Sequence, residues 1–241
     1  MLKDSFQPDM LSQTLKHESL ADQIHARLRR AIMSGQLPPG ERLVYRTLAA
    51  EMGVSSTPVR DAVQRLVSDG VLEMDDRGTA ALPRLDPARF VEVIALRIEL
   101  EGRAAEAAAQ GGPELAAELA ELNAGMEAAR ARGDQRTTLD LNERLHFTIV
   151  RHAEMPVLEG VLRSLWLQCG PSLQFLYTED YPKSTLRHPH YDLIEAIGHR
   201  DGPAARAAIT QDLVRHGCHI LRKIRKMVGE DDSGEIPAAW L

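Results

Sequence analysis

The sequence predicts a mainly α-helical protein with two parts: an N-terminal winged helix-turn-helix of three helices plus a small β-hairpin, followed by an all-α helical bundle. Three observations predict this fold class. Two short helical patterns flank Gly53 within residues 41–82, at the spacing of a helix-turn-helix. Two short extended segments follow and bracket a glycine-containing turn, which is typical of a hairpin. After residue 84, alanine, leucine, glutamate and arginine dominate, and this composition favours helices.

The first helix is expected from Leu20 to Ser34, because apolar residues recur there every four positions. The second is expected over Arg46–Met52, and Gly53 ends it. The third should begin near Thr57, a good N-cap followed by Pro58 at the first helical position, and should end at Asp69-Gly70. The predicted wing strands are 71–74 and 79–82.

A helix fits the major groove of DNA, and the residues of its first turn reach the base edges. The candidate DNA-binding residues lie at the start of the third helix, in the helix before it, further along the third helix, and at the wing tip. They are Arg46, Ser55, Ser56, Thr57, Arg60, Arg65 and Gly78. The pattern alone leaves an alternative open, a buried helical hairpin that contacts no nucleic acid.

The charge distribution weakens the general electrostatic signal for DNA. Of 241 residues with a net charge of −6, residues 1–84 contain eleven Lys+Arg and eleven Asp+Glu, so this part is neutral. Local placement of arginines must therefore attract the phosphates. The absence of an 18-residue apolar run predicts no membrane span, and the N-terminus lacks an apolar signal region, so a cytoplasmic protein is expected.

The expected division of the chain is a flexible arm over 1–18, a DNA-binding domain over 19–84, an all-helical bundle over 87–228, and a tail over 229–241 that frays. Pro83 and Pro87 mark the linker. After a first bundle helix capped by Asp86, the further helices are expected at 115–131, 139–152, 156–179, 184–199 and 203–228.

Polar residues on three of these helices suit a divalent metal such as zinc, nickel or manganese. Asn142 and His146 lie four apart on one helix face, His190 opens a later helix, and Asp212 lies on the last. The alternative is that His146 is an ordinary hydrogen-bonded core histidine.

Arg97, four residues before Glu101, allows two interpretations as well. It could form an exposed ion pair, or it could bind the carboxylate of a small acid.

Two stretches resemble a known family. LAAEMGVSSTPVRDAVQRLVSDGVLE, followed by RGT and preceded by LRRAIMSGQLPPGERLV, resembles the winged helix of the GntR family of bacterial transcription regulators, over roughly residues 19 to 84. LRIELEGRAAEAAA, LDLNERLHFTIV and HPHYDLIEAIGHRDGPAARAAITQDLVRH resemble the FCD effector domain of its FadR subfamily, over roughly residues 87 to 228. The resemblance implies that the helical bundle over 87–228 is an effector-binding and dimerisation domain.

The resemblance implies a metal held by Asn142, His146 and His190, but Asp212 stands where the family usually has a fourth ligand, histidine. His216 could substitute only if the last helix were shifted by one turn. The resemblance also implies that Arg97 faces the cavity and binds a small organic or sugar acid. Ser56 stands where most relatives have arginine, so the preferred operator should differ from the commonest one.

The sequence therefore predicts a homodimeric DNA-binding transcription regulator that is not an enzyme. It would bind a palindromic double-stranded operator and act as a repressor released by a carboxylate effector. A metal-responsive regulator and a metal-free ligand sensor remain alternatives. A metal-dependent hydrolase or lyase is a remote one, because the sequence has no His-Glu-x-x-His segment.

Overall fold

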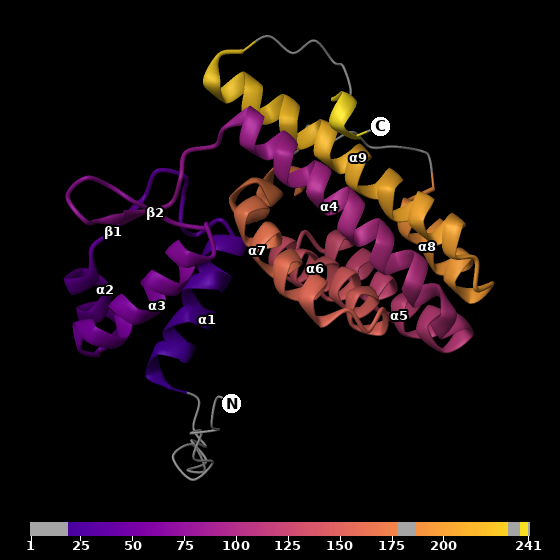
Figure 1. Ribbon diagram of the computed structural model, residues 1–241, viewed down its shortest axis with the longest axis horizontal. Helices are drawn as coiled ribbons and strands as arrows, with labels where there is room; N and C mark the ends of the chain where they lie inside the picture. The colour runs from indigo at the N-terminus through magenta and orange to yellow at the C-terminus, as the bar shows by residue number, and fades with distance from the viewer. Residues whose placement is uncertain (1–18, 178–186, 231–236, 241) are drawn as a thin grey trace, which may run out of the picture.

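The computed structural model describes residues 19–177, 187–230 and 237–240. The expected arm, 1–18, and half of the expected tail lie outside the described residues. Three short helices and a small sheet form one side of the molecule, and a bundle of longer helices forms the other (Figure 1). Within the described part of the chain, no helix combines the length and the apolar character needed to cross a membrane.

The N-terminal domain has the predicted order of helices and a wing. Its elements are α1 (Leu20–Met33), β1 (Arg42–Leu43), α2 (Tyr45–Met52), α3 (Ser56–Ser68), β2 (Glu73–Met74) and β3 (Ala80–Ala81). The wing strands are shorter than predicted, and β3 pairs antiparallel with both β2 and β1. Strand β1 was not predicted, because two residues carry no periodic signal.

The turn between α2 and α3 depends on Gly53, whose φ of 67° lies in the left-handed region that glycine favours. The prediction of Thr57 as the N-cap of α3 is wrong, since Ser55 occupies that position with an extended backbone. Three hydroxyl residues stand in a row here, and the Ser55 side chain makes no capping hydrogen bond. Side-chain preference therefore could not decide between them.

The C-terminal part is an all-helical bundle, as predicted. Its helices are α4 (Pro87–Ala108), α5 (Gly112–Ala131), α6 (Gln135–His152), α7 (Pro156–Leu173), α8 (Pro189–Gly198) and α9 (Gly202–Val228). Short 3-10 turns occur at Ala109–Gly111, Gln174–Tyr177 and Ala238–Trp240. Asp86 caps α4 as expected, accepting a hydrogen bond from the Ala88 amide. Both α5 and α6 begin earlier than predicted, and α7 ends earlier, with a 3-10 turn after it.

Helix α4 lies along α9 at one face of the bundle (Figure 1). The C-terminal turn packs on this pair, so the expectation of a frayed tail is wrong at its end. Trp240 is buried, its indole Nε1 donates to the Val91 carbonyl at 3.0 Å, and its ring meets Phe90 edge-on. An aromatic side chain of this size can hold a short terminal segment against a helix pair.

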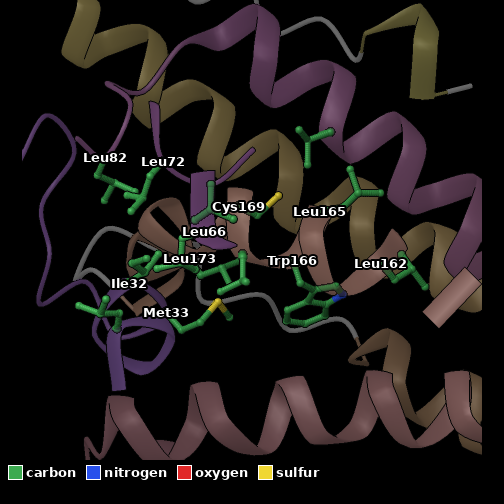
Figure 2. Packing of buried hydrophobic residues seen from close by; sticks show 14 of the residues in the cluster. Ile32, Met33, Leu66, Leu72, Leu82, Leu162, Leu165, Trp166, Cys169 and Leu173 are labelled. Carbon is green, nitrogen blue, oxygen red and sulfur yellow. The ribbon is translucent and has the colours of Figure 1, made fainter. Parts of the chain in front are cut away.

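One apolar core cluster spans the two domains, and a second lies within the bundle alone. Figure 2 shows Ile32 and Met33 of α1 close to Leu173 of α7, and Cys169 of α7 belongs to the same cluster. Helix α7 carries a glycine at the closest approach, Gly170, where an added Cβ would lie 2.8 Å from the sulfur of Met33. Helix α7 is therefore packed directly against the DNA-binding domain.

Candidate nucleic-acid interface and metal centre

The start of α3 and the wing tip enclose an open groove of about 390 Å³. Four of the predicted DNA-binding residues line it, namely Arg46, Ser56, Arg60 and Gly78. Arg60 is exposed, and its guanidinium carbon lies 5.8 Å from the centre of the Tyr45 ring. Ser55 and Thr57 are exposed beside this groove, at the beginning of the helix. Hydroxyl and guanidinium donors thus converge where a duplex could lie.

Arg65 lies elsewhere, in the last turn of α3, where it forms an ion pair with Asp22 of α1. Asp22 also completes a capping box with Ser19 at the start of α1. Hydrogen bonds from Ser19 and then from Arg65 lower the pKa of the Asp22 carboxyl to about 2. Arg65 therefore joins α3 to α1, at the opposite end of the helix from the groove.

Three of the four predicted metal ligands meet in the bundle: His146 of α6, His190 of α8 and Asp212 of α9. His146 Nε2 is 3.6 Å from Asp212 Oδ2, and His190 Nε2 is 3.5 Å from Asp212 Oδ1. All three side chains are buried. Asn142 is half-buried, one helical turn before His146 on α6.

Two of these facing atoms, His190 Nε2 and Asp212 Oδ1, are buried without a hydrogen-bond partner among the described residues. A buried polar atom left unpaired costs about 1–3 kcal/mol. Ligands on a tetrahedral ion with bonds near 2.1 Å lie roughly 3.4 Å apart, close to the separations seen here. The unpaired atoms and the chemistry of the donors therefore fit a divalent cation.

The protonation states fit the same ion. Burial would raise the pKa of the Asp212 carboxyl, but His216 and His190 outweigh burial and hold that pKa well below its usual range. Burial lowers the pKa of His190, and burial together with His190 lowers the pKa of His188 to about 3. A carboxylate beside neutral imidazoles, as His188 and His190 become when their pKa values fall, is the form in which these groups bind metals.

A second layer of polar groups orients the two buried imidazoles. His146 Nδ1 donates to Glu101 Oε2 at 2.6 Å, and His190 Nδ1 donates to the side-chain oxygen Oδ1 of Asn123 at 3.2 Å. In each ring this leaves Nε2 directed toward Asp212. Metal-binding histidines are commonly oriented by such an acceptor on the other nitrogen.

Glu101 is the centre of this second layer. Its Oε1 accepts hydrogen bonds from Arg97 Nε at 2.7 Å and from the Trp166 indole at 3.0 Å. Burial would raise the pKa of Glu101, but Arg97 and then His146 outweigh burial and lower that pKa to about 2. The alternative of an exposed Arg97–Glu101 pair is wrong, since the pair exists but is buried, with the Arg97 guanidinium carbon 4.0 Å from the centre of the Trp166 ring.

Sequence reasoning missed one member of the cluster, His188, while His216 stands one turn after Asp212 as its spacing indicated. His188 Nδ1 lies 3.9 Å from Asp212 Oδ1, and His216 Nδ1 lies 3.2 Å from the same oxygen. His216 shares the helix face of Asp212, but it groups with His188 and Asp212 and not with His146 and His190. Its substitution for the fourth ligand only after a shift of the last helix therefore stays a prediction. The spacing His188-x-His190 carried the signal for His188, whereas nothing in the sequence indicated Asn123.

Helix α7 connects this cluster to the end of α3, which we call the recognition helix because its first turn lies at the groove. Trp166 of α7 binds Glu101, while on the same helix Ser164 Oγ donates to the Asp69 carbonyl at 2.6 Å and Gln168 Nε2 donates to it at 3.4 Å. Arg89 of α4 adds hydrogen bonds to the Gly70 carbonyl, 2.6 Å, and to Gln168, 3.2 Å. The turn that ends α3 is thus held by the bundle.

The fold defines a winged-helix DNA-binding protein with a helical C-terminal domain. Residues 20–81 match the family described as bacterial regulatory proteins, gntR family, and residues 92–215 match the FCD domain. The chain belongs to the GntR family and carries an FCD domain. It is a DNA-binding transcription regulator, and its relatives are regulators rather than enzymes.

Two curated relatives illustrate the similarity. The HTH-type transcriptional regulator McbR of Escherichia coli (strain K12) is 30% identical over 82% of this chain and 90% of its own length. The probable D-xylose utilization operon transcriptional repressor of Paenarthrobacter nicotinovorans is 26% identical over 86% of this chain and 92% of its own length.

A solved structure, E. coli McbR/YncC, superposes with a TM-score of 0.73 at 28% identity, over 88% of this chain and 97% of that one. The fold is shared by a putative transcriptional regulator GntR from Rhodococcus sp. RHA1, which is 20% identical. It superposes with a TM-score of 0.68 over 84% of this chain and 97% of that one.

Proposed function

We propose that this regulator is a homodimeric repressor that leaves a palindromic operator when a small carboxylate binds in a metal-containing pocket of the FCD domain. The observation that supports the metal-containing pocket is the pair of buried, unpaired ligand atoms, His190 Nε2 and Asp212 Oδ1, which face each other at 3.5 Å. Natural proteins keep few such atoms, so a pair of them facing one another supports a bound cation.

For the operator, we assign base contacts to the exposed first turn of α3 and phosphate contacts to the groove beside it. Arg60 can bind a guanine edge or a phosphate through its planar guanidinium, and Ser55 and Thr57 offer hydroxyls. Arg46 and Gly78 line the same groove as this helix start. Two such surfaces in a symmetric dimer would bind one half-site each.

In the bundle, His146, His190 and Asp212 would hold a zinc, nickel or manganese ion, with Asn142 as a further oxygen ligand from α6. The ion would supply a positive charge that can accept an oxygen of the effector. We assign the other carboxylate contact to Arg97, whose guanidinium has five N–H donors and is held rigidly by Glu101 through Nε. A fixed, buried guanidinium binds a carboxylate strongly because water does not compete.

We propose that α7 transmits effector binding to the DNA-binding domain. Its Trp166 binds Glu101 in the second layer of the pocket, and its Ser164 and Gln168 bind the carbonyl of Asp69 at the end of α3. An effector that favours one position of α7 would therefore reorient the recognition helix. Such coupling typically changes affinity by about 1–3 kcal/mol.

The test combines metal analysis with gel shifts. Operator fragments are selected from genomic DNA with the intact protein, and the metal content of the purified protein is measured. We expect close to one tightly held ion per chain, a specific fragment, and its release by one member of a panel of small organic and sugar acids. Protein without metal that still discriminates operators would contradict the metal pocket while leaving the regulator intact.

Dialysis against a chelator separates the alternatives. In the proposed mechanism, metal removal abolishes the response to the acid but leaves operator affinity unchanged. A pure metal sensor would instead change its operator affinity when the ion is removed. A metal-free sensor would keep its acid response throughout. The name of the Paenarthrobacter relative, a probable transcriptional repressor, supports our proposal that this regulator represses transcription when it binds the operator.

A further inference from the structure

We propose that the cluster contains a second cation subsite, formed by His188, Asp212 and His216, beside the triad of His146, His190 and Asp212. The subsite would take a first-row divalent ion such as zinc and would share the Asp212 carboxylate with the first ion. The inference rests on the proposed metal pocket, because Asp212 belongs to both triads.

The donor atoms of the described residues fall into two triads that share Asp212. In each triad the donor atoms lie within 4.8 Å of one another. We call His188, Asp212 and His216 the outer triad. It has the shortest distance between a histidine nitrogen and an Asp212 oxygen in the two triads, 3.2 Å between His216 Nδ1 and Asp212 Oδ1. His188 Nδ1 lies 3.9 Å from the same oxygen. These separations are close to the roughly 3.4 Å expected between two ligands on one zinc ion.

The carboxylate of Asp212 is oriented to serve both triads. Oδ2 faces His146, while Oδ1 faces His188, His190 and His216. Although three imidazole nitrogens lie within 3.9 Å of Oδ1, none of these contacts meets hydrogen-bond geometry, and Oδ1 is buried. A carboxylate oxygen surrounded in this way fits a cation better than a set of hydrogen bonds. Two-metal sites commonly have ions about 3.5–4 Å apart, a spacing that one carboxylate can bridge.

The outer triad is also accessible to an ion from solvent. The side chains of His188 and His216 are 18% and 15% exposed, against 2% for His146 and 0% for His190, so the second subsite lies on the solvent side of the first. The only hydrogen bond to His188 Nδ1 among the described residues is a long one, 3.3 Å, from the His190 amide, so a cation at this nitrogen would displace a weak contact.

The experiment counts zinc ions. The untagged full-length protein is stripped with a chelator, titrated with zinc chloride in a calorimeter, desalted and assayed for zinc. We expect two equivalents for the wild type and one for His216→Gln, with circular dichroism showing that the variant is folded. His188→Gln is the second outer variant and should also bind one. His152→Gln, which alters an exposed histidine at the end of α6, is the matched control and should keep two.

Each outcome decides between the two proposals. A wild type that binds one equivalent, lost on changing His146 to alanine, overturns the second subsite and leaves the proposed pocket standing. A wild type that binds none overturns both. Two equivalents that persist in both outer variants would place the second ion elsewhere and also overturn the subsite.

Discussion

Glu101→Gln should destabilise the protein far more than its small change in volume suggests. The wild-type carboxylate is 2% exposed and accepts hydrogen bonds from Arg97, Trp166 and His146. The variant keeps the shape but removes the charge that neutralises Arg97. Breaking a buried ion pair by removing one partner typically costs about 3–5 kcal/mol, because the other charge stays buried. In a protein of this size each kcal/mol lowers Tm by about 2–4 °C, so a fall of roughly 6–20 °C is expected.

The same variant should weaken metal binding through the ring of His146. A glutamine presents one acceptor oxygen and one NH2 group. If the oxygen keeps the bonds from Arg97 and Trp166, the NH2 group faces His146 Nδ1, which must then become the acceptor. The ring proton moves to Nε2, and the nitrogen that faces Asp212 can no longer bind a cation. Loss of such an orienting partner typically costs about 10–100-fold in metal affinity.

Glu99→Gln is the matched control, since Glu99 lies on the same helix and also pairs with an arginine, Arg206, at 2.9 Å. That pair is exposed, and exposed pairs contribute at most about 1 kcal/mol. Thermal melting of the chelator-treated proteins, followed by zinc titration, measures both effects. Equal Tm values for the two variants would refute the assignment of Glu101 as a buried charge centre.

The effect of Glu101 on stability should also depend on pH in a defined way. The pKa of Glu101 falls from an ordinary value of 4.5 to about 2 in the folded protein. A depressed pKa means that ionisation stabilises the fold, fully so above pH 4.5. The advantage of the wild type over Glu101→Gln should therefore be constant above pH 4.5 and shrink as the pH falls toward 2.

Three further predictions concern the other parts of the mechanism. Arg60→Ala should lower specific operator affinity by about 1–3 kcal/mol in gel shifts, whereas Arg132→Ala, an exposed arginine of the bundle, should not. His146→Ala should reduce the zinc content of the purified protein, and unchanged content by elemental analysis would exclude this residue as a ligand. The double variant Ser164→Ala and Gln168→Ala should keep operator binding but lose most of its response to the effector. A full response in that variant would count against transmission through α7.

The sequence predicted the DNA-binding domain well because its signals are local. A left-handed glycine at position 53, a proline in the first turn of α3 and a glycine at the wing tip each act within a few residues. Strand β1 escaped prediction because its pairing with β3 is decided by residues some forty positions away. The buried end of the tail, at Trp240, depends on a partner 149 residues earlier in the chain.

The cluster around Asp212 was predictable to the extent that its members share a helix. His146 was found from its spacing to Asn142, and His216 was placed one turn after Asp212 by the same rule. That Glu101 and Asn123 orient the histidines depends on how α4 and α5 pack against α6 and α8. Packing between helices far apart in sequence leaves no periodic signal in either of them.

The proposed transmission through α7 needs no flexible hinge between the bundle and the DNA-binding domain. Ser164 and Gln168 lie four residues apart and bind the end of α3, while Trp166, between them in sequence, binds the buried Glu101. A rigid helix with fixed contacts at both the pocket and the recognition helix cannot shift at one and stay still at the other. The shared apolar core between α1 and α7 strengthens this linkage, because close-packed side chains transmit a displacement rather than absorb it.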